Sequence, residues 1–254
     1  MGLFGGPRYP EEVARRVPPG QRLVKTWPVL HHGSVPGFDP ATWRLELTGL
    51  VERPVSLTYE ELRALPTVEV VADMHCVTGW STLDNAWTGV SFRTLAELAR
   101  PLPEAAWVIA RCEHGYTSNL SLQAMLDDDV LVAWAHGGRD LTPEHGYPLR
   151  LVVPGWYSTY WVKMLSDIEV LDKPDDGYWM KTAYRIPDVP GANIKPGQTG
   201  FKTVPINRMV PRSFVTNLTD GAKVAAGTPV ALRGIAFGGD CGVKAVDFSG
   251  DGGA

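Results

Sequence analysis

The chain has 254 residues, of which 44% are hydrophobic and 20% are charged, and its formal net charge is −4. This composition is ordinary for a globular protein with one large domain, or with one domain and a smaller one. The negative charge and the lack of a Lys/Arg-rich block argue against a nucleic-acid partner, and no run of about 18 apolar residues predicts a membrane-spanning helix.

The N-terminal region contains no apolar segment typical of a secretion signal, and its twin arginine, Arg15-Arg16, is followed by the sequence VPPGQ rather than by an apolar stretch. We therefore expect a cytoplasmic protein, and a periplasmic one only if a leader is missing. The three cysteines, Cys76, Cys112 and Cys241, have no CxxC spacing. An odd, sparse set of this kind argues against a disulfide framework and a zinc site, and it rules out a CxxCH haem attachment, so we expect any cysteine chemistry to come from a single thiol.

Short strands and short helices alternate irregularly along the first part of the chain. The patterns predict strands over 43–51, 68–77 and 107–113, and helices over 57–65 and 91–100. The first helix carries the capping-box spacing of Thr58 and Glu61. The second strand is rich in β-branched residues and ends at Cys76.

The middle of the chain continues this irregular pattern. A short helix is predicted over 120–126, followed by a strand within 127–135. The most apolar stretch, 145–172, predicts two strands around the Pro154-Gly155 break. Because strands and helices do not form repeating βαβ units, the sequence favours the α+β class.

Three regions with different composition divide the chain. We expect a main domain over 1–175, a Pro/Gly-rich connecting loop over 176–204, and short strands with glycine-rich turns over 205–254. The last pattern is that of a β-sandwich, but a full sandwich needs about 100 residues. We therefore predict that residues beyond about 205 pack poorly alone or complete their sheet with a partner chain.

Cys76 lies at the end of a predicted strand, where a side chain can be held rigidly and still face a cleft. By position alone, a small buried hydrophobic residue is the more common role. A hydrolytic cysteine would need a base, and His75 is next to it in sequence. Neighbours along a strand point to opposite faces, so His75 is a poor candidate for that base.

Two long segments resemble the sulfite oxidase superfamily. MHCVTGWSTLDNAWTGVSFRTL is similar to its cysteine segment, and EHGYPLRLVVPGWYSTYWVK is similar to its pterin-binding segment. The N-terminal part resembles small single-domain bacterial members, and the C-terminal part resembles bacterial sulfite dehydrogenases. The resemblance implies a mixed, β-rich molybdopterin-binding fold, followed by a partial immunoglobulin-like segment of the kind that mediates homodimers.

The resemblance also implies a set of site residues. Cys76 matches the ligand cysteine, whose soft thiolate suits molybdenum held by a pterin dithiolene. Arg150 would pair with the phosphate of the cofactor. The other cofactor-binding positions are His31, His32, His145, Trp161, Val162 and Lys163. His32 and Trp134 would line the substrate pocket beside the metal.

Three departures from the family pattern concern the substrate. Sulfite-oxidising members carry an arginine beside the first-loop histidine, where this chain has Leu30 and His31. They carry another shortly after the ligand cysteine, and none follows Cys76 through Trp80. They also have a tyrosine where this chain has Trp134. Because a buried dianion needs cationic surroundings, these changes weaken the assignment of sulfite as substrate.

The resemblance predicts two-electron oxo transfer, either sulfite oxidation or reduction of an S- or N-oxide such as methionine sulfoxide. No haem or flavin motif occurs in the sequence, so we expect a separate electron-transfer partner such as a cytochrome or a quinone-linked protein. The alternative is a cofactor-free, β-rich binding module in which Cys76 is a buried thiol and the C-terminal strands mediate association.

Overall fold

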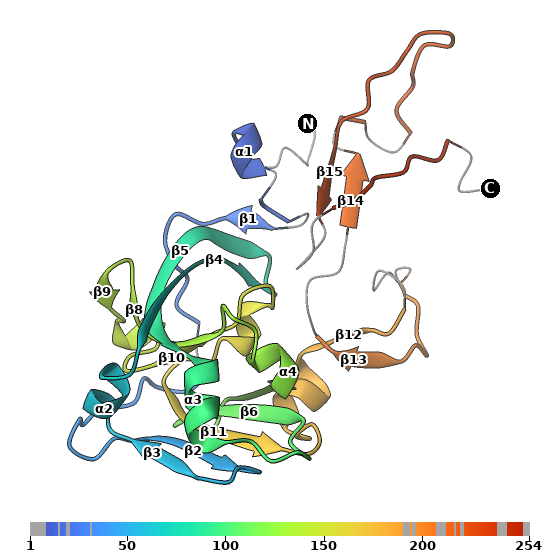
Figure 1. Cartoon of the computed structure of the whole chain (residues 1–254). Coiled ribbons are helices and arrows are strands. Elements are labelled where there is room, and N and C mark those ends of the chain that lie inside the picture. Colours follow the sequence, from blue (N-terminus) through green and yellow to red (C-terminus); the bar gives the residue numbers. More distant parts are fainter. Residues whose placement is uncertain are drawn as a thin grey trace.

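The fold is described from a computed structural model, which is shown in Figure 1. The structure describes residues 9–14, 16–18, 21–30, 32–189, 194, 197–206, 212–215, 217–218, 221–237 and 243–250. Within these ranges no helix has both the length and the apolar character needed to cross a membrane.

One of the two large sheets has six strands, and it carries the N-terminal strand. Its strands are β1 (Arg22–Leu23), β4 (Thr67–Cys76), β5 (Trp80–Ser91), β8 (Leu131–His136), β9 (Arg139–Asp140) and β10 (Arg150–Val152). The main order is β1-β5-β8-β10, with β4 also paired to β5 and β9 to β8. In Figure 1 the long β4 and β5 strands arch over the middle of the molecule.

The second large sheet has five strands and forms the base of the molecule in Figure 1. Its order is β3 (Val55–Leu57), β2 (Leu45–Gly49), β11 (Leu165–Leu171), β6 (Trp107–Cys112) and β7 (Thr117–Ser121). Strand β11 runs parallel to β2 and antiparallel to β6. The sheet is therefore mixed, as the α+β prediction and the predicted fold family require.

Short helices connect and cover the strands. They are α1 (Glu11–Ala14), α2 (Tyr59–Arg63), α3 (Phe92–Ala99), α4 (Leu122–Met125), the 3-10 helices η1 (Pro143–His145) and η2 (Ser158–Tyr160), and the π-helix η3 (Trp179–Ala183). The capping box predicted for α2 is confirmed, since the Thr58 hydroxyl accepts from the Glu61 N–H and the Glu61 carboxylate accepts from the Thr58 N–H. Helix α3 buries Phe92, Leu95 and Ala99 against the core.

Among the strands that were not predicted are β5 and β7, and the predicted connecting loop contains regular structure. Strand β5 carries Asp84, Asn85 and Gly89, residue types that are depleted in strands. Pairing with β4 along its length and with β8 outweighs this local preference. Strand β7 precedes the helix predicted over 120–126. The expected loop over 176–204 contains η3 and the strand β12 (Arg185–Pro187), and it reaches β13 (Thr203–Pro205).

The C-terminal segment has little regular structure among its described residues. Strands β14 (Arg212–Val215) and β15 (Gly234–Phe237) form an antiparallel pair that lies apart from the large sheets in Figure 1. Several described hydrophobic side chains are exposed there, namely Val215, Val224, Val230, Leu232, Val243, Val246 and Phe248. The immunoglobulin-like segment and its role in a dimer stay predictions.

Gly49 ends β2 at a position that excludes larger residues. Its φ is +86°, and a Cβ there would lie 2.2 Å from the Val170 carbonyl oxygen of β11. Because left-handed backbone strain adds to a clash with fixed backbone, we expect Gly49→Ala to lower the free energy of unfolding by about 2–4 kcal/mol. Urea unfolding followed by tryptophan fluorescence would measure this loss.

Gly138→Ala is the matched control, because Gly138 has a φ of +73° but open space around the added Cβ. This variant should show only the backbone cost, about 1–2 kcal/mol. Equal losses in the two variants would contradict the argument that the approach of β11 to Gly49 matters.

Candidate functional site

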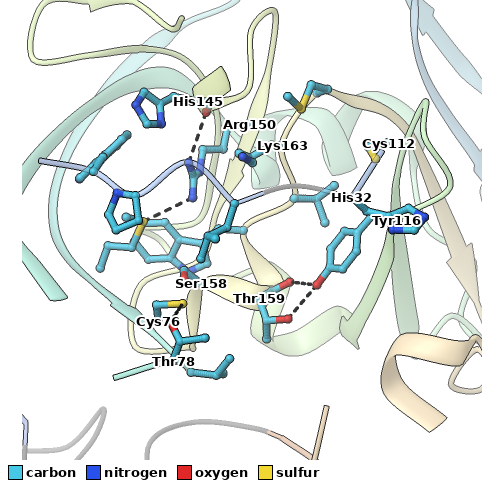
Figure 2. A pocket seen from close by; sticks show the side chains of 18 of the residues that line it. His32, Cys76, Thr78, Cys112, Tyr116, His145, Arg150, Ser158, Thr159 and Lys163 are labelled. Atoms are coloured by element: carbon cyan, nitrogen blue, oxygen red, sulfur yellow. Dashed lines mark hydrogen bonds between the residues drawn. The ribbon is translucent and has the colours of Figure 1, made fainter. Parts of the chain in front are cut away.

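A cavity of about 350 Å³ lies beside the end of β4 and the segment from η1 to Met164. It is also lined by residues from the N-terminal segment, the β6–β7 hairpin and η3. Figure 2 shows Cys76, Arg150 and Lys163 around this cavity, although they come from elements far apart in the sequence. Most of the site residues predicted from the sequence therefore line this cavity.

Cys76 is the last residue of β4, and only 8% of it is exposed. The turn to β5 begins directly after it, with Gly79 at a φ of +85° donating its N–H to the Cys76 carbonyl. The same carbonyl accepts a hydrogen bond of 3.0 Å from Gln21 Nε2. The Cys76 thiol lines the cavity from a backbone position that two hydrogen bonds hold. Its role as metal ligand stays a prediction.

Arg150 begins β10 and is 5% exposed. Its guanidinium lies 5.6 Å from the ring centre of Trp27 and 5.4 Å from that of Trp87. Nη1 donates to the His145 carbonyl at 3.3 Å, Nη2 contacts the Met74 sulfur at 3.4 Å, and Nε has no partner among the described residues. Burial lowers the pKa of Arg150 to about 10, so the side chain is still charged at neutral pH.

Lys163 adds a second cation next to Arg150. The two residues form an antiparallel β-bridge, and Lys163 Nζ donates to the Glu144 carbonyl at 2.8 Å. Burial, followed by the charge of Arg150, lowers the pKa of Lys163 to about 8. Two neighbouring cations with no paired carboxylate among the described residues form a site that an anionic group would stabilise.

The two buried cations and the nearby thiol match the chemistry of the molybdenum–pterin cofactor. A buried charge without a partner is costly, and guanidinium binds phosphate well. An anionic, phosphate-bearing ligand at Arg150 and Lys163 would remove that cost, and a thiol at Cys76 offers a soft donor to the metal. The residues present therefore fit the cofactor.

His145 and Trp161 line the same cavity, and they differ in whether their ring nitrogen is free to bind a ligand. The His145 ring packs edge-on against Trp27 at 4.8 Å. Burial, followed by the charge of Arg150, lowers the pKa of His145, so its ring is neutral at pH 7 and can accept a hydrogen bond. Trp161 donates its indole N–H to the Val153 carbonyl at 2.8 Å. Trp161 and the buried Val162 therefore contribute shape to the cavity wall.

Of the remaining predicted residues, one lines the cavity, one does not, and one is not described. His32 is exposed and lines the cavity with its ring 5.4 Å from Trp179. His31 lies outside the described residues. Trp134 is buried but does not line the cavity, and the Arg63 guanidinium lies 5.6 Å from its ring centre.

The position of Trp134 has a structural cause. In the pairing of β5 with β8, Thr88 faces Ala135 and Gly89 faces Ala133, so Trp134 is the extra residue of a bulge. A bulge redirects the side chain that it carries, and the resemblance on which the prediction rested carries no information about such a local change. Because Trp134 is not among the residues that line the cavity, the prediction that it lines the substrate pocket is corrected.

Several cavity residues were not found from the sequence. Cys112, His114 and Tyr116 occupy alternate positions of the β6–β7 hairpin and line one wall together. The Tyr116 hydroxyl is 2.7 Å from the Thr159 hydroxyl. Figure 2 shows the two side chains facing each other. Burial raises the pKa of Tyr116 well above its usual value. Alternate polar residues at a strand end were the only signal that could have indicated this wall.

Comparison with known proteins supports the same family. The profile of the oxidoreductase molybdopterin-binding domain matches residues 32–179, which is more than half of the chain. An uncharacterized oxidoreductase of Bacillus subtilis, YuiH, is 42% identical over 191 residues, which cover 75% of this chain and 96% of YuiH. The catalytic subunit MsrP of the protein-methionine-sulfoxide reductase of Gluconobacter oxydans is 32% identical over 179 residues, or 63% of this chain and 56% of MsrP.

A solved structure has a similar fold. The sulfane dehydrogenase SoxCD of Paracoccus pantotrophus superposes with a TM-score of 0.63 at 22% identity, over 94% of this chain and 70% of that chain. At this identity the likeness concerns the fold alone. The profile match begins at residue 32, so Gln21 and Trp27, which contact the candidate site, lie before the matched region.

Proposed function

This chain belongs to the family of oxidoreductases with a molybdopterin-binding domain, within the sulfite oxidase superfamily, and on that basis we propose that it reduces small neutral S- or N-oxides. The chain is a molybdopterin-dependent oxidoreductase, so the alternative of a non-catalytic binding module is not supported. When bound, the molybdenum centre supplies two-electron chemistry coupled to loss or gain of an oxygen atom. Reduction of a sulfoxide consumes two electrons and two protons and releases the sulfide and water.

The positions of the positively charged side chains around the cavity support a neutral substrate over sulfite. Among the described residues that line the cavity, Arg150 and Lys163 are the arginine and lysine side chains. Both belong to the segment that resembles the pterin-binding part of the family. If they hold the anionic cofactor, no described arginine or lysine of the wall remains for a sulfite dianion, which would be costly to enclose without one.

Three other arginines could have supplied positive charge, and the structure places each of them elsewhere. Arg111 pairs with Asp167 and Glu169 on the second sheet. Arg139 is exposed on β9. Arg185 donates to the Met180 carbonyl at 3.0 Å and to Thr203. None of the three lines the cavity.

The rest of the wall favours a neutral substrate with an apolar part. It is formed largely by aromatic and aliphatic side chains, namely Trp27, Pro28, Leu30, Val77, Trp80, Trp179 and Tyr184. Apolar walls stabilise alkyl or aryl groups and leave a single polarised oxygen for hydrogen bonding. A neutral sulfoxide or N-oxide matches this surface better than a compact dianion does.

We assign the site residues within this proposal as follows. The Cys76 thiolate binds the metal, Arg150 and Lys163 bind the anionic groups of the cofactor, and neutral His145 accepts a hydrogen bond from it. His32, at the exposed edge of the cavity, contacts the entering substrate. Trp161 and Val162 shape the wall beside the cofactor.

Electrons come from a separate protein in this proposal. The MsrP relative is described as a catalytic subunit, which supports a division between a catalytic chain and an electron-transfer chain. We propose the same division for this chain, with the electron donor unidentified.

Metal analysis and a substrate comparison test the proposal. Purified protein should contain about one molybdenum per chain, and with reduced viologen it should reduce methionine sulfoxide or trimethylamine N-oxide. We expect kcat/KM for the best neutral oxide to exceed that for sulfite, assayed with an artificial acceptor, by about 100-fold, the equivalent of one to two charged hydrogen bonds. Faster turnover of sulfite would contradict the assignment of a neutral substrate.

Leu30→Arg provides a matched test of the charge argument. Leu30 lines the cavity and is 56% exposed, so an arginine there can enter without disturbing the core. This variant should gain sulfite turnover and lose activity on neutral oxides, whereas Leu30→Gln, of similar length and without charge, should gain no sulfite turnover. Equal behaviour of the two variants would count against a role for charge in substrate choice.

A further inference from the structure

The hydroxyl group of Thr78 is in direct contact with the Cys76 sulfur. Its hydroxyl oxygen lies 3.2 Å from Cys76 Sγ, and Figure 2 shows the two side chains facing each other. We propose that Thr78 donates a hydrogen bond to the ligand sulfur and thereby raises the reduction potential of the bound metal. This inference rests on the proposed role of Cys76 as ligand, and it assigns Thr78 as a positioning and tuning residue.

The direction of the hydrogen bond follows from the chemistry of the ligand. A free thiol and a hydroxyl can each donate to the other, so the contact alone leaves the donor open. A thiolate bound to a metal has no proton and can only accept. Once Cys76 binds the metal, the Thr78 hydroxyl must therefore be the donor.

The backbone around the contact is fixed by its surroundings. Thr78 lies in the turn between β4 and β5, where the Gly79 N–H donates to the Cys76 carbonyl at 3.0 Å. Gln21 Nε2 donates to the same carbonyl at 3.0 Å, and the Ser81 hydroxyl donates to Gln21 Oε1 at 3.1 Å. The distance between the Thr78 hydroxyl and the sulfur is thus maintained by the turn and by the N-terminal segment.

The chain Cys76–Gln21–Ser81 continues to a buried histidine. His75 is buried, and its Nδ1 lies 2.8 Å from the Ser81 hydroxyl. Because the Ser81 proton goes to Gln21, His75 must donate through Nδ1. These hydrogen bonds link the Cys76 carbonyl, Gln21, Ser81 and His75 in series. Together they hold the turn after Cys76 in one conformation.

A hydrogen bond to the sulfur changes the electron density at the metal. It draws charge from the thiolate and so favours the reduced, more electron-rich metal, as hydrogen bonds to ligand sulfurs do in other metal centres. Removing the hydroxyl should lower the reduction potential.

The experiment compares Thr78→Val, which keeps the shape and removes the hydroxyl, with Thr78→Ser, which keeps the hydroxyl. Molybdenum content of the wild-type protein is measured first, which tests the proposed function separately. Potentiometry followed by electron paramagnetic resonance then gives the Mo(VI)/Mo(V) potential of each loaded protein. We expect the valine variant to be about tenfold harder to reduce, a downward shift of about 59 mV for one electron, and the serine variant to stay near the wild type.

Each outcome decides for or against the hydrogen bond. A lower potential in the valine variant alone supports it, and so does loss of molybdenum from the valine variant while the serine variant stays loaded. An unchanged potential in a loaded valine variant overturns it. Equal shifts in both variants, or loss of molybdenum from both, also overturn it, because the turn rather than the hydroxyl would then be responsible.

Discussion

Cys76→Ser is expected to lower the molybdenum content from about one atom per chain to near zero, because an alkoxide is a much harder ligand than a thiolate. Activity on S- or N-oxides should disappear with the metal. The protein should still fold, since the exchange of sulfur for oxygen at a position that is 8% exposed changes little volume. Elemental analysis and circular dichroism of the same preparation measure both results.

Cys112→Ser is the matched control for metal content. Cys112 is also 8% exposed and also lines the cavity, but on the β6–β7 wall. This variant should suffer a similar small change in stability and keep its molybdenum. Retention of the metal by the Cys76 variant, or its loss from the Cys112 variant, would show that the ligand has been assigned to the wrong thiol.

Arg150→Met is expected to have opposite effects on cofactor content and on the stability of the cofactor-free protein. The buried guanidinium has no carboxylate partner among the described residues, and burial already lowers its pKa to about 10. Replacing a buried ion by an apolar side chain of similar volume often stabilises a protein, here by about 1–3 kcal/mol in the cofactor-free state. Cofactor content should fall at least about tenfold, because the anionic group loses its charged partner.

Denaturant unfolding of cofactor-free protein, together with pterin and molybdenum analysis, measures both effects. Arg111→Met is the control, because Arg111 pairs with Asp167 and Glu169 away from the cavity. That variant should lose stability and keep the cofactor. If cofactor-free Arg150→Met were clearly less stable than the wild type, Arg150 would be a packing residue rather than a charge kept for a ligand.

Local sequence patterns predicted elements whose determinants lie within a few residues. The helix at Tyr59–Arg63 begins at a capping box, and the strand that ends at Cys76 is marked by its β-branched residues. Strand β5 was missed because Asp84, Asn85 and Gly89 disfavour a strand locally, and only pairing with its neighbours makes the strand favourable. The segment after 176 was expected to be a loop because of its prolines and glycines, yet Met180 from this segment packs into the core.

For the candidate site too, some residues were predicted from the sequence and others were not. Resemblance of two segments indicated Cys76, His145, Arg150 and Lys163, and the structure brings them to one cavity. The resemblance also indicated Trp134, which lies at a bulge of β8 and is not among the residues that line the cavity.

By itself, the sequence determined the family and the cofactor, because these depend on which side chains are present at given positions. Only the tertiary structure decided which side chains meet. It showed that Arg111, Arg139 and Arg185 do not line the cavity and that Thr78 faces the Cys76 sulfur. It also showed that Gln21 holds the Cys76 carbonyl from 55 residues away. Such contacts depend on how strands far apart in the sequence pair and turn, so the local sequence around each residue does not predict them.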